Sequence, residues 1–340
     1  MQDEINNFLR VGLPQYRPTI IRCEPDYYGA ADLIAAGLGI EKPPIPPRAT
    51  WSHGARFFPP TTVEEVLPER PSFLHQVNIL VATKRQCELL ECHRIKASPV
   101  GCPYLYAASV PERKRIEGSL LIMPPHTLPY TSEAYHEERY AQRMADIRSE
   151  FGGLAACVSQ FDIDKGLWVK AFRKYDIPVV AGARLDDANA LVRMKALFES
   201  FEYMTTNSLG SHVAYAAFSG CKVSFFGPWE GLQKQAMGND SIYKRHPLLL
   251  ERLCGLFAEE NMRETFPTFF CEPWRARPMR DWASDMLGAE NQRPLEEFID
   301  HFQWNMKGRL LYRCGRIKSG VLLPMRWLKD TCVKLRKNDT

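Results

Sequence analysis

The sequence predicts an α/β protein of two domains, each built on a parallel sheet covered by helices. The 340 residues exceed the usual size of one domain and fit two domains of roughly 100 to 200 residues each. Apolar runs of strand length alternate with helical patterns through most of the first 226 residues, which is typical of parallel sheets. With 45% hydrophobic and 25% charged residues, the chain can bury a large core.

The first predicted domain spans residues 1–115 and has a β-α-β-α-β pattern. Strand-like or extended runs are expected at 18–23, 48–52, 77–82 and 100–107, and helices at 30–38 and 84–93. The proline-rich connector at 42–47 cannot be helical. This half is short and irregular, and residues 1–17 match no element.

The second predicted domain, residues 116–235, repeats the strand-helix pattern more regularly. Strands are expected at 119–123, 154–158 and 178–181, helices at 135–151, 165–174 and 188–201, and a strand-turn-helix-strand unit at 203–228. Because these strands are short and apolar, they predict a parallel sheet that is covered on both faces. The strand pattern then stops, and residues 236–340 predict a helical extension with helices at 246–258 and 295–304.

The composition excludes several classes of protein. A formal net charge of +4 is too small to indicate nucleic-acid binding, and the ten cysteines include no C-x-x-C pair, which argues against zinc and thioredoxin-like chemistry. No signal-peptide pattern and no apolar run of about 18 residues is visible. Reduced cysteines then favour a cytoplasmic location.

The unit at 203–228 carries the clearest chemical signal. A strand runs into Asn207-Ser208-Leu-Gly210-Ser211-His212, and small or apolar residues at helical spacing follow. Asn207 or Ser208 is the expected N-cap, and Gly210 allows close approach of a ligand. The free N–H groups and positive dipole of such a helix start suit a phosphate. The alternative is an ordinary capped unit that binds no ligand.

This N-S-x-G-S-H-x-x-Y-A segment, with its helix, glycine and K-V-x-x-x-G-P strand, resembles the second Rossmann-like domain of GT-B glycosyltransferases that build bacterial surface polysaccharides. The resemblance covers about residues 116 to 230. It implies two Rossmann-like domains facing across a cleft, with terminal helices that cross back onto the first domain. It also implies a nucleotide-sugar donor in the second domain, a saccharide or lipid-linked acceptor in the first, and no cofactor.

Ligands of open parallel sheets lie beyond the carboxyl ends of the strands, and this rule selects the catalytic candidates. His53 precedes a glycine at such an end and could take the proton of an acceptor hydroxyl as a neutral imidazole. Asp26 or Glu24 is the competing base, and His126 could bond a donor phosphate or the leaving group. Each of the two histidines could instead have a purely structural role.

Seven residues are expected to bind the donor. Those at the phosphate turn are Asn207, Ser208, Gly210, Ser211 and His212, and the others are Arg184 and Glu230. A cation at the position of His212 opposes the helix dipole unless an anion is bound. Arg184 lies where the resemblance places the base or ribose, although a salt bridge would explain it equally well.

No metal is expected. The single D-x-D tripeptide at a strand end, Asp162-Ile-Asp164, is predicted to cap the following helix. Two other functions stay open: a non-hydrolysing sugar-nucleotide epimerase, and a degenerate glycosyltransferase-like protein that binds nucleotide sugars without catalysis.

The tail is strongly basic. From residue 307 to residue 337, ten Lys or Arg face one acid, Asp330, and leucines are interspersed. Such a segment can rest on anionic lipid, with each basic residue contributing roughly 1 kcal/mol. The alternative is a solvated helix packed on the first domain.

Overall fold

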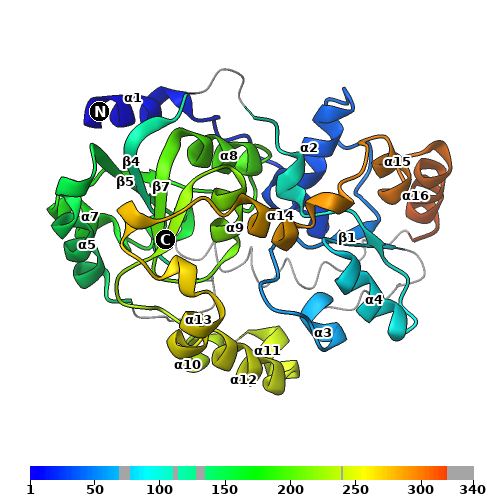
Figure 1. Ribbon diagram of the computed structural model, residues 1–340. Helices are drawn as coiled ribbons and strands as arrows, with labels where there is room; N and C mark the ends of the chain where they lie inside the picture. The colour runs from blue at the N-terminus through cyan, green and yellow to red at the C-terminus, as the bar shows by residue number, and fades with distance from the viewer. Residues whose placement is uncertain (69–76, 110–113, 128–134, 239, 320–340) are drawn as a thin grey trace, which may run out of the picture.

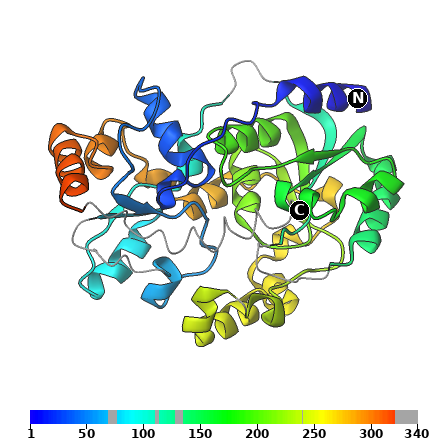
Figure 2. The same ribbon diagram turned by 180° about the vertical axis from the view of Figure 1, so that it is seen from behind.

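The protein is an α/β structure with two parallel sheets. A computed structural model describes residues 1–68, 77–109, 114–127, 135–238 and 240–319. One sheet has three strands in the order β1-β2-β3, and the other has five strands in the order β6-β5-β4-β7-β8. The two sheets lie in separate halves of the molecule, with α14 between them (Figures 1 and 2).

The five-stranded sheet follows the predicted pattern closely. Its strands are β4 (Ile116–Ile122), β5 (Gly153–Val158), β6 (Val179–Ala181), β7 (Phe201–Thr206) and β8 (Lys222–Phe225). Because all are parallel, their carboxyl ends share one edge.

Helices cover both faces of this sheet. Leu120 and Ile122 pack with α5 (Glu137–Asp146) and α7 (Val169–Lys174), whereas Leu121 packs on the face of α8 (Ala190–Ser200) and α9 (Ser211–Phe218). The alternation places apolar side chains on both sides of each strand, which is why these strands read as continuous apolar runs.

The three-stranded sheet departs from the prediction. Its strands are β1 (Ala49–Trp51), β2 (Asn78–Val81) and β3 (Ser98–Pro99), with α2 (Ala30–Gly37), α3 (Val63–Val66) and α4 (Lys84–Cys92) beside it. The strand predicted at 18–23 is wrong, because Pro18 makes only an isolated bridge, to Asp187. The extended run predicted at 100–107 is also wrong, since η4 (Pro103–Tyr106) forms a 3-10 helix there.

Within the described residues, the first helix and two late helices pack on the half that is distant from them in sequence. At the start, α1 (Gln2–Asn7) joins β5, where the Gln2 side chain donates to the Leu154 carbonyl at 3.1 Å and accepts from its N–H at 3.0 Å. At the other end, α14 (Arg280–Leu287) and α15 (Glu297–His301) return to the three-stranded sheet, where the Cys102 N–H donates to the Leu287 carbonyl at 2.9 Å. Residues 1–17 therefore help to cover the second half, and the expected return of the C-terminal segment is observed (Figure 1).

Short helices gather below the two halves. They are α10 (Lys234–Met237), α11 (Ser241–Arg245), α12 (Pro247–Leu256) and α13 (Glu259–Thr265). An ion pair of 2.6 Å between Arg252 and Glu65 ties this group to α3. The helix predicted at 165–174 begins only at Val169, as α7, because Gly166 and Trp168 adopt positive φ, and a separate helix that was not predicted, α6 (Gln160–Asp164), precedes it.

The remaining elements are short turns of helix and one terminal helix. They are η1 (Phe8–Gly12), η2 (Glu24–Gly29), η5 (Arg148–Glu150), η6 (Pro267–Phe269), η7 (Pro273–Arg275), η8 (Ala289–Asn291) and α16 (Met306–Ser319). Within the described residues, no helix combines the length and apolar character needed to cross a bilayer. The basic tail beyond residue 319 lies outside the described residues.

Candidate functional site

The turn between β7 and α9 is built as a helix start without a side-chain cap. Asn207 and Ser208 are buried directly after the strand. The N-cap is Gly210, and no side chain bonds to the first turn of the helix. The prediction of Asn207 or Ser208 as the cap is therefore wrong, and the reason is that the chain continues for two more residues before it turns into α9.

The backbone N–H groups of this turn point to no protein acceptor. Those of Leu209, Gly210, Ser211 and His212 make no hydrogen bond within the described part of the chain, whereas the Ser208 N–H donates to Thr206 Oγ1 at 3.3 Å. Unpaired N–H groups at a helix start carry a partial positive charge. An anion of phosphate size is the ligand that such a turn favours.

The side chains of the turn are held in place by the first half of the molecule. Ser211 Oγ accepts a hydrogen bond of 3.0 Å from the Ala55 N–H, and the Tyr215 hydroxyl donates to the His53 carbonyl. Both partners lie in the loop that follows β1. The loop after β1 therefore lies against the first two turns of α9.

His53 stands in this loop with an unusual environment. Its ring packs edge-on against Tyr28, with ring centroids 4.7 Å apart. Its Nδ1 is buried and has no hydrogen-bond partner among the described residues. Burial first, and then the positive charges of Arg56 and His126, lower the pKa of His53 to about 4. At neutral pH the ring is an uncharged imidazole that can accept a proton.

His212 is the second neutral imidazole of the site. Its Nε2 lies 3.1 Å from the hydroxyl of Thr206, and its ring folds back over Gly210. Burial, followed by the charge of His126, lowers the pKa of His212 to about 3. His126 contributes to the lowered pKa of both rings, so it lies within electrostatic range of the loop after β1 and of the first turn of α9.

His126 itself is exposed. Its Nδ1 lies 3.3 Å from the Thr127 carbonyl, and it follows Pro124 and Pro125 at the end of β4. The structure thus brings His53, His126 and His212 together with the phosphate turn.

The acidic candidates of the first half serve the local backbone. Asp26 is fully buried, and its carboxylate accepts from the Arg22 N–H at 2.8 Å, the Arg22 side chain at 3.1 Å and the Cys23 N–H at 3.2 Å. Glu24 accepts from the Trp51 N–H at 3.0 Å. With its oxygens turned inward to these donors, Asp26 has no face for an acceptor hydroxyl, so the structure argues against it as a base.

The structure separates Arg184 from the phosphate turn. Arg184 follows β6, which is three strands, about 14 Å, from β7. It pairs with Asp186 at 3.1 Å and lies over the ring of Tyr16, 4.5 Å from its centroid. The salt-bridge alternative therefore accounts for this residue.

Glu230, by contrast, lies beside the turn. Its N–H donates to the Asn207 carbonyl at 2.7 Å, and the Asn207 side chain donates to the Pro228 carbonyl at 2.6 Å. The Asn207 Oδ1 is buried without a partner in the described residues. Asn207 thus fixes the loop after β8 and keeps one acceptor unused.

Some residues of the site were not predicted. Thr206 contacts His212, and Tyr215 bonds to the His53 loop. In the sequence, only the positions of Thr206 and Tyr215 next to the turn could have indicated these roles.

Asp162 does not cap its helix, because Ser159 does so at 3.2 Å. The Asp162 carboxylate instead accepts from the Thr127 N–H at 3.1 Å, which fixes the loop after β4. Within the described ranges, no group of three metal-binding side chains is found.

Comparison with known proteins adds no relative. No family model matches the chain, and no curated protein is significantly similar to it. The functional argument therefore depends on the residues of the site.

Proposed function

We propose that the protein is a metal-independent glycosyltransferase of the GT-B type. In this proposal, residues 116–235 bind a nucleotide sugar, residues 1–115 bind a saccharide or lipid-linked acceptor, and the two sheets face each other across a cleft. The product is a cell-surface polysaccharide, and the reaction takes place in the cytoplasm. The resemblance of residues 116–230 to such enzymes supports the proposal at the level of motif.

One observation carries the proposal. The unbonded N–H groups of Leu209 to His212 belong to the same turn whose Ser211 side chain contacts the loop that holds the uncharged His53. An anion site beside a neutral imidazole is what transfer from a phosphate leaving group requires.

The proposed reaction follows from these positions. The bond between the anomeric carbon and the phosphate oxygen breaks, and the bond electrons leave with the nucleotide. The N–H groups of the turn stabilise the negative charge that grows on the phosphate. The acceptor hydroxyl attacks the anomeric carbon and gives its proton to His53. The bound phosphate raises the low pKa of His53, which makes the ring a better base only when the donor is present.

The test is a panel of UDP-, GDP-, TDP- and CMP-linked sugars. We expect one nucleotide class to bind by calorimetry and its sugar to be released slowly in the absence of acceptor. Isomerisation of the sugar without release would indicate an epimerase. Binding without any reaction would indicate a non-catalytic protein, and no binding across the panel would contradict the proposal.

We further propose that α16 contacts an anionic membrane, where a lipid-linked acceptor would lie. Met306, Leu310 and Leu311 are 79%, 54% and 51% exposed on a helix that also carries Lys307 and Arg309. Apolar side chains between cations suit a lipid interface. Vesicles with phosphatidylglycerol should sediment the protein and neutral vesicles should not. Replacing Leu310 and Leu311 by Glu should abolish sedimentation, and an unchanged yield would contradict this contact.

A further inference from the structure

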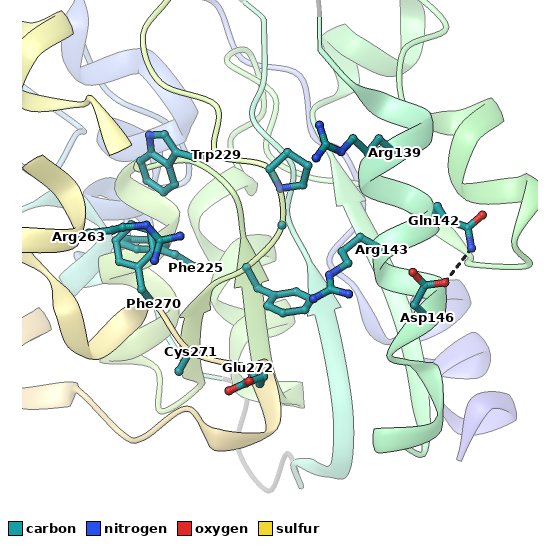
Figure 3. A pocket seen from close by; sticks show the side chains of 13 residues that line it. Arg139, Gln142, Arg143, Asp146, Phe225, Trp229, Arg263, Phe270, Cys271 and Glu272 are labelled. Carbon is teal, nitrogen blue, oxygen red and sulfur yellow. Dashed lines mark hydrogen bonds between the residues drawn. The ribbon is translucent and has the colours of Figure 1, made fainter. Parts of the chain in front are cut away.

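A cavity of about 570 Å³ opens at the carboxyl end of β8. One wall is α5, which presents Arg139 and Arg143 one turn apart. The other wall is the end of α13 and the chain that follows it, with Arg263 and Phe270 (Figure 3). The cavity lies at the edge strand β8, where Phe226 packs with α5 and Phe225, Trp229 and Phe270 pack with the core that contains α9.

The cavity combines aromatic rings with fixed cations. Its aromatic residues are Phe225, Phe226, Trp229 and Phe270. The Arg143 guanidinium lies 4.6 Å from the ring centroid of Phe226, and that of Arg263 lies 4.4 Å from the centroid of Phe270. Contact with a ring face restrains each guanidinium and leaves its N–H edges available.

The charge of the cavity is not balanced by its own acids. Arg139 and Arg143 form no ion pair with any residue in the described ranges, although Arg263 pairs with Glu259 at 2.8 Å. The lining holds three arginines against two acids, Asp146 and Glu272, of which Asp146 accepts from the neutral Gln142 at 2.8 Å and Glu272 lies 3.8 Å from Arg275. Arg139 and Arg143 therefore provide unpaired donors for an anionic group.

The cavity is connected to the phosphate turn through a shared wall. Gly227, Pro228 and Trp229 line it, and the Pro228 carbonyl accepts the hydrogen bond from Asn207 at 2.6 Å. A ligand in the cavity would therefore rest on the loop that Asn207 fixes beside the turn.

We propose that this cavity binds an anionic saccharide, with the sugar face on the aromatic rings and its carboxylate or phosphate on Arg139 and Arg143. The apolar C–H face of a pyranose packs on an aromatic ring, and the guanidinium fork matches both anionic groups. This binding site is additional to the acceptor site proposed for residues 1–115, and it does not rest on the proposed glycosyltransferase function.

The test uses calorimetry with three probes: a galacturonic acid hexamer, glucose 6-phosphate and the neutral maltohexaose. We expect at least one anionic probe to bind, with an affinity that decreases as salt rises, and at least about tenfold weaker binding of maltohexaose. Whether the hexamer or the sugar phosphate binds more tightly identifies the anionic group. Failure of both anionic probes, or equal binding of maltohexaose, would overturn the proposal.

Variants locate the site. Arg139→Gln with Arg143→Gln should weaken the anionic probe at least about tenfold, because two charge-assisted contacts are lost. Lys170→Gln with Arg173→Gln on α7 removes the same charge outside the cavity and should change affinity less than about twofold. All four side chains are exposed, so folding is expected to persist. Equal loss in both double variants would overturn the location.

The result of the saccharide-binding test does not depend on whether the turn before α9 binds a donor. Nucleotide-sugar binding should be unchanged in Arg139→Gln with Arg143→Gln. If the wild-type protein binds the anionic saccharide but no nucleotide sugar, the glycosyltransferase proposal fails and the cavity assignment stands.

Discussion

Two helix starts at the carboxyl ends of parallel strands differ in what fills their first turn. At α4, the Gln86 N–H donates to Thr83 Oγ1 at 3.4 Å, and the Gln86 side chain accepts from the Thr83 N–H at 3.0 Å. At α9, the N-cap is Gly210, and no side chain bonds to the turn. We call the α4 start closed, because its own side chains bond to its first turn, and the α9 start open. In our proposal, the open start binds a ligand and the closed start serves stability alone.

The largest effect is expected at His53, the proposed base in the loop beside the open start. His53→Gln keeps the size of the side chain but removes the proton acceptor. Turnover should decrease about 10²- to 10⁴-fold, as for loss of a general base, with donor affinity nearly unchanged. Steady-state kinetics with the donor found in the panel measures it. His93→Gln, on the exposed end of α4, is the matched control and should leave turnover unchanged. Wild-type turnover in His53→Gln would exclude the base.

A carboxylate placed at the start of α9 should weaken donor binding. In Gly210→Asp the new carboxylate takes the N–H groups of the turn and repels a phosphate. Donor affinity should decrease roughly 100-fold, about 2.7 kcal/mol. Gly210→Ala is the control, because a Cβ there meets the His212 ring at 2.8 Å in both variants and only Asp adds charge. Equal donor affinities of the two variants by calorimetry would contradict binding of an anion at this turn.

Removing the N-cap side chain of α4 should lower the free energy of unfolding and leave donor affinity unchanged. Thr83→Ala removes the side-chain cap of α4 and should cost about 1 kcal/mol of unfolding free energy. Chemical denaturation measures the change, and Ser159→Ala at α6 should behave in the same way. A change of donor affinity in Thr83→Ala would break the distinction between the two starts.

The smallest expected effect is a pH-dependent uptake of protons when the donor binds at the start of α9. The pKa of His53 is lowered to about 4 and that of His212 to about 3, so both are uncharged at pH 5 in the free protein. A bound diphosphate raises these pKa values, and the protein should therefore take up a fraction of a proton on binding at pH 5 and none at pH 8. Calorimetry in two buffers of different ionisation enthalpy measures the uptake. An enthalpy independent of buffer at pH 5 would contradict it.

Folding stability should respond to the same two groups. Because each folded-state pKa lies below the usual value of 6.5, the unfolded chain binds more protons as the pH decreases. Their contribution is present above pH 6.5 and is lost as the pH approaches 4. His53→Gln should make this decline shallower in denaturation curves at pH 7 and pH 5. An unchanged decline would contradict the burial of the ring.

The two halves also differ in how far the sequence predicted them. The five-stranded sheet was predictable because β4, β5 and β7 are buried on both faces and read as apolar runs. In the three-stranded sheet, β3 has two residues, and the run at 18–23 finds its partner at Asp187, which no local pattern indicates.

The site was predicted in the same uneven way. The phosphate turn and His53 followed from their places after strands. Asp26 pairs with Arg22, and Arg184 pairs with Asp186. These ion pairs depend on side-chain directions, which the spacing of residues in the sequence does not determine. The N-cap at Gly210 depends on where the backbone turns, which the serine and asparagine before it obscured.

The most direct test of the open start is amide NMR of the full chain titrated with inorganic pyrophosphate. The account predicts saturating shifts of the Leu209, Gly210, Ser211 and His212 amides and none at Gln86, whose N–H is already bonded to Thr83. Absence of shifts at residues 209–212, or shifts of the same size at Gln86, would contradict it.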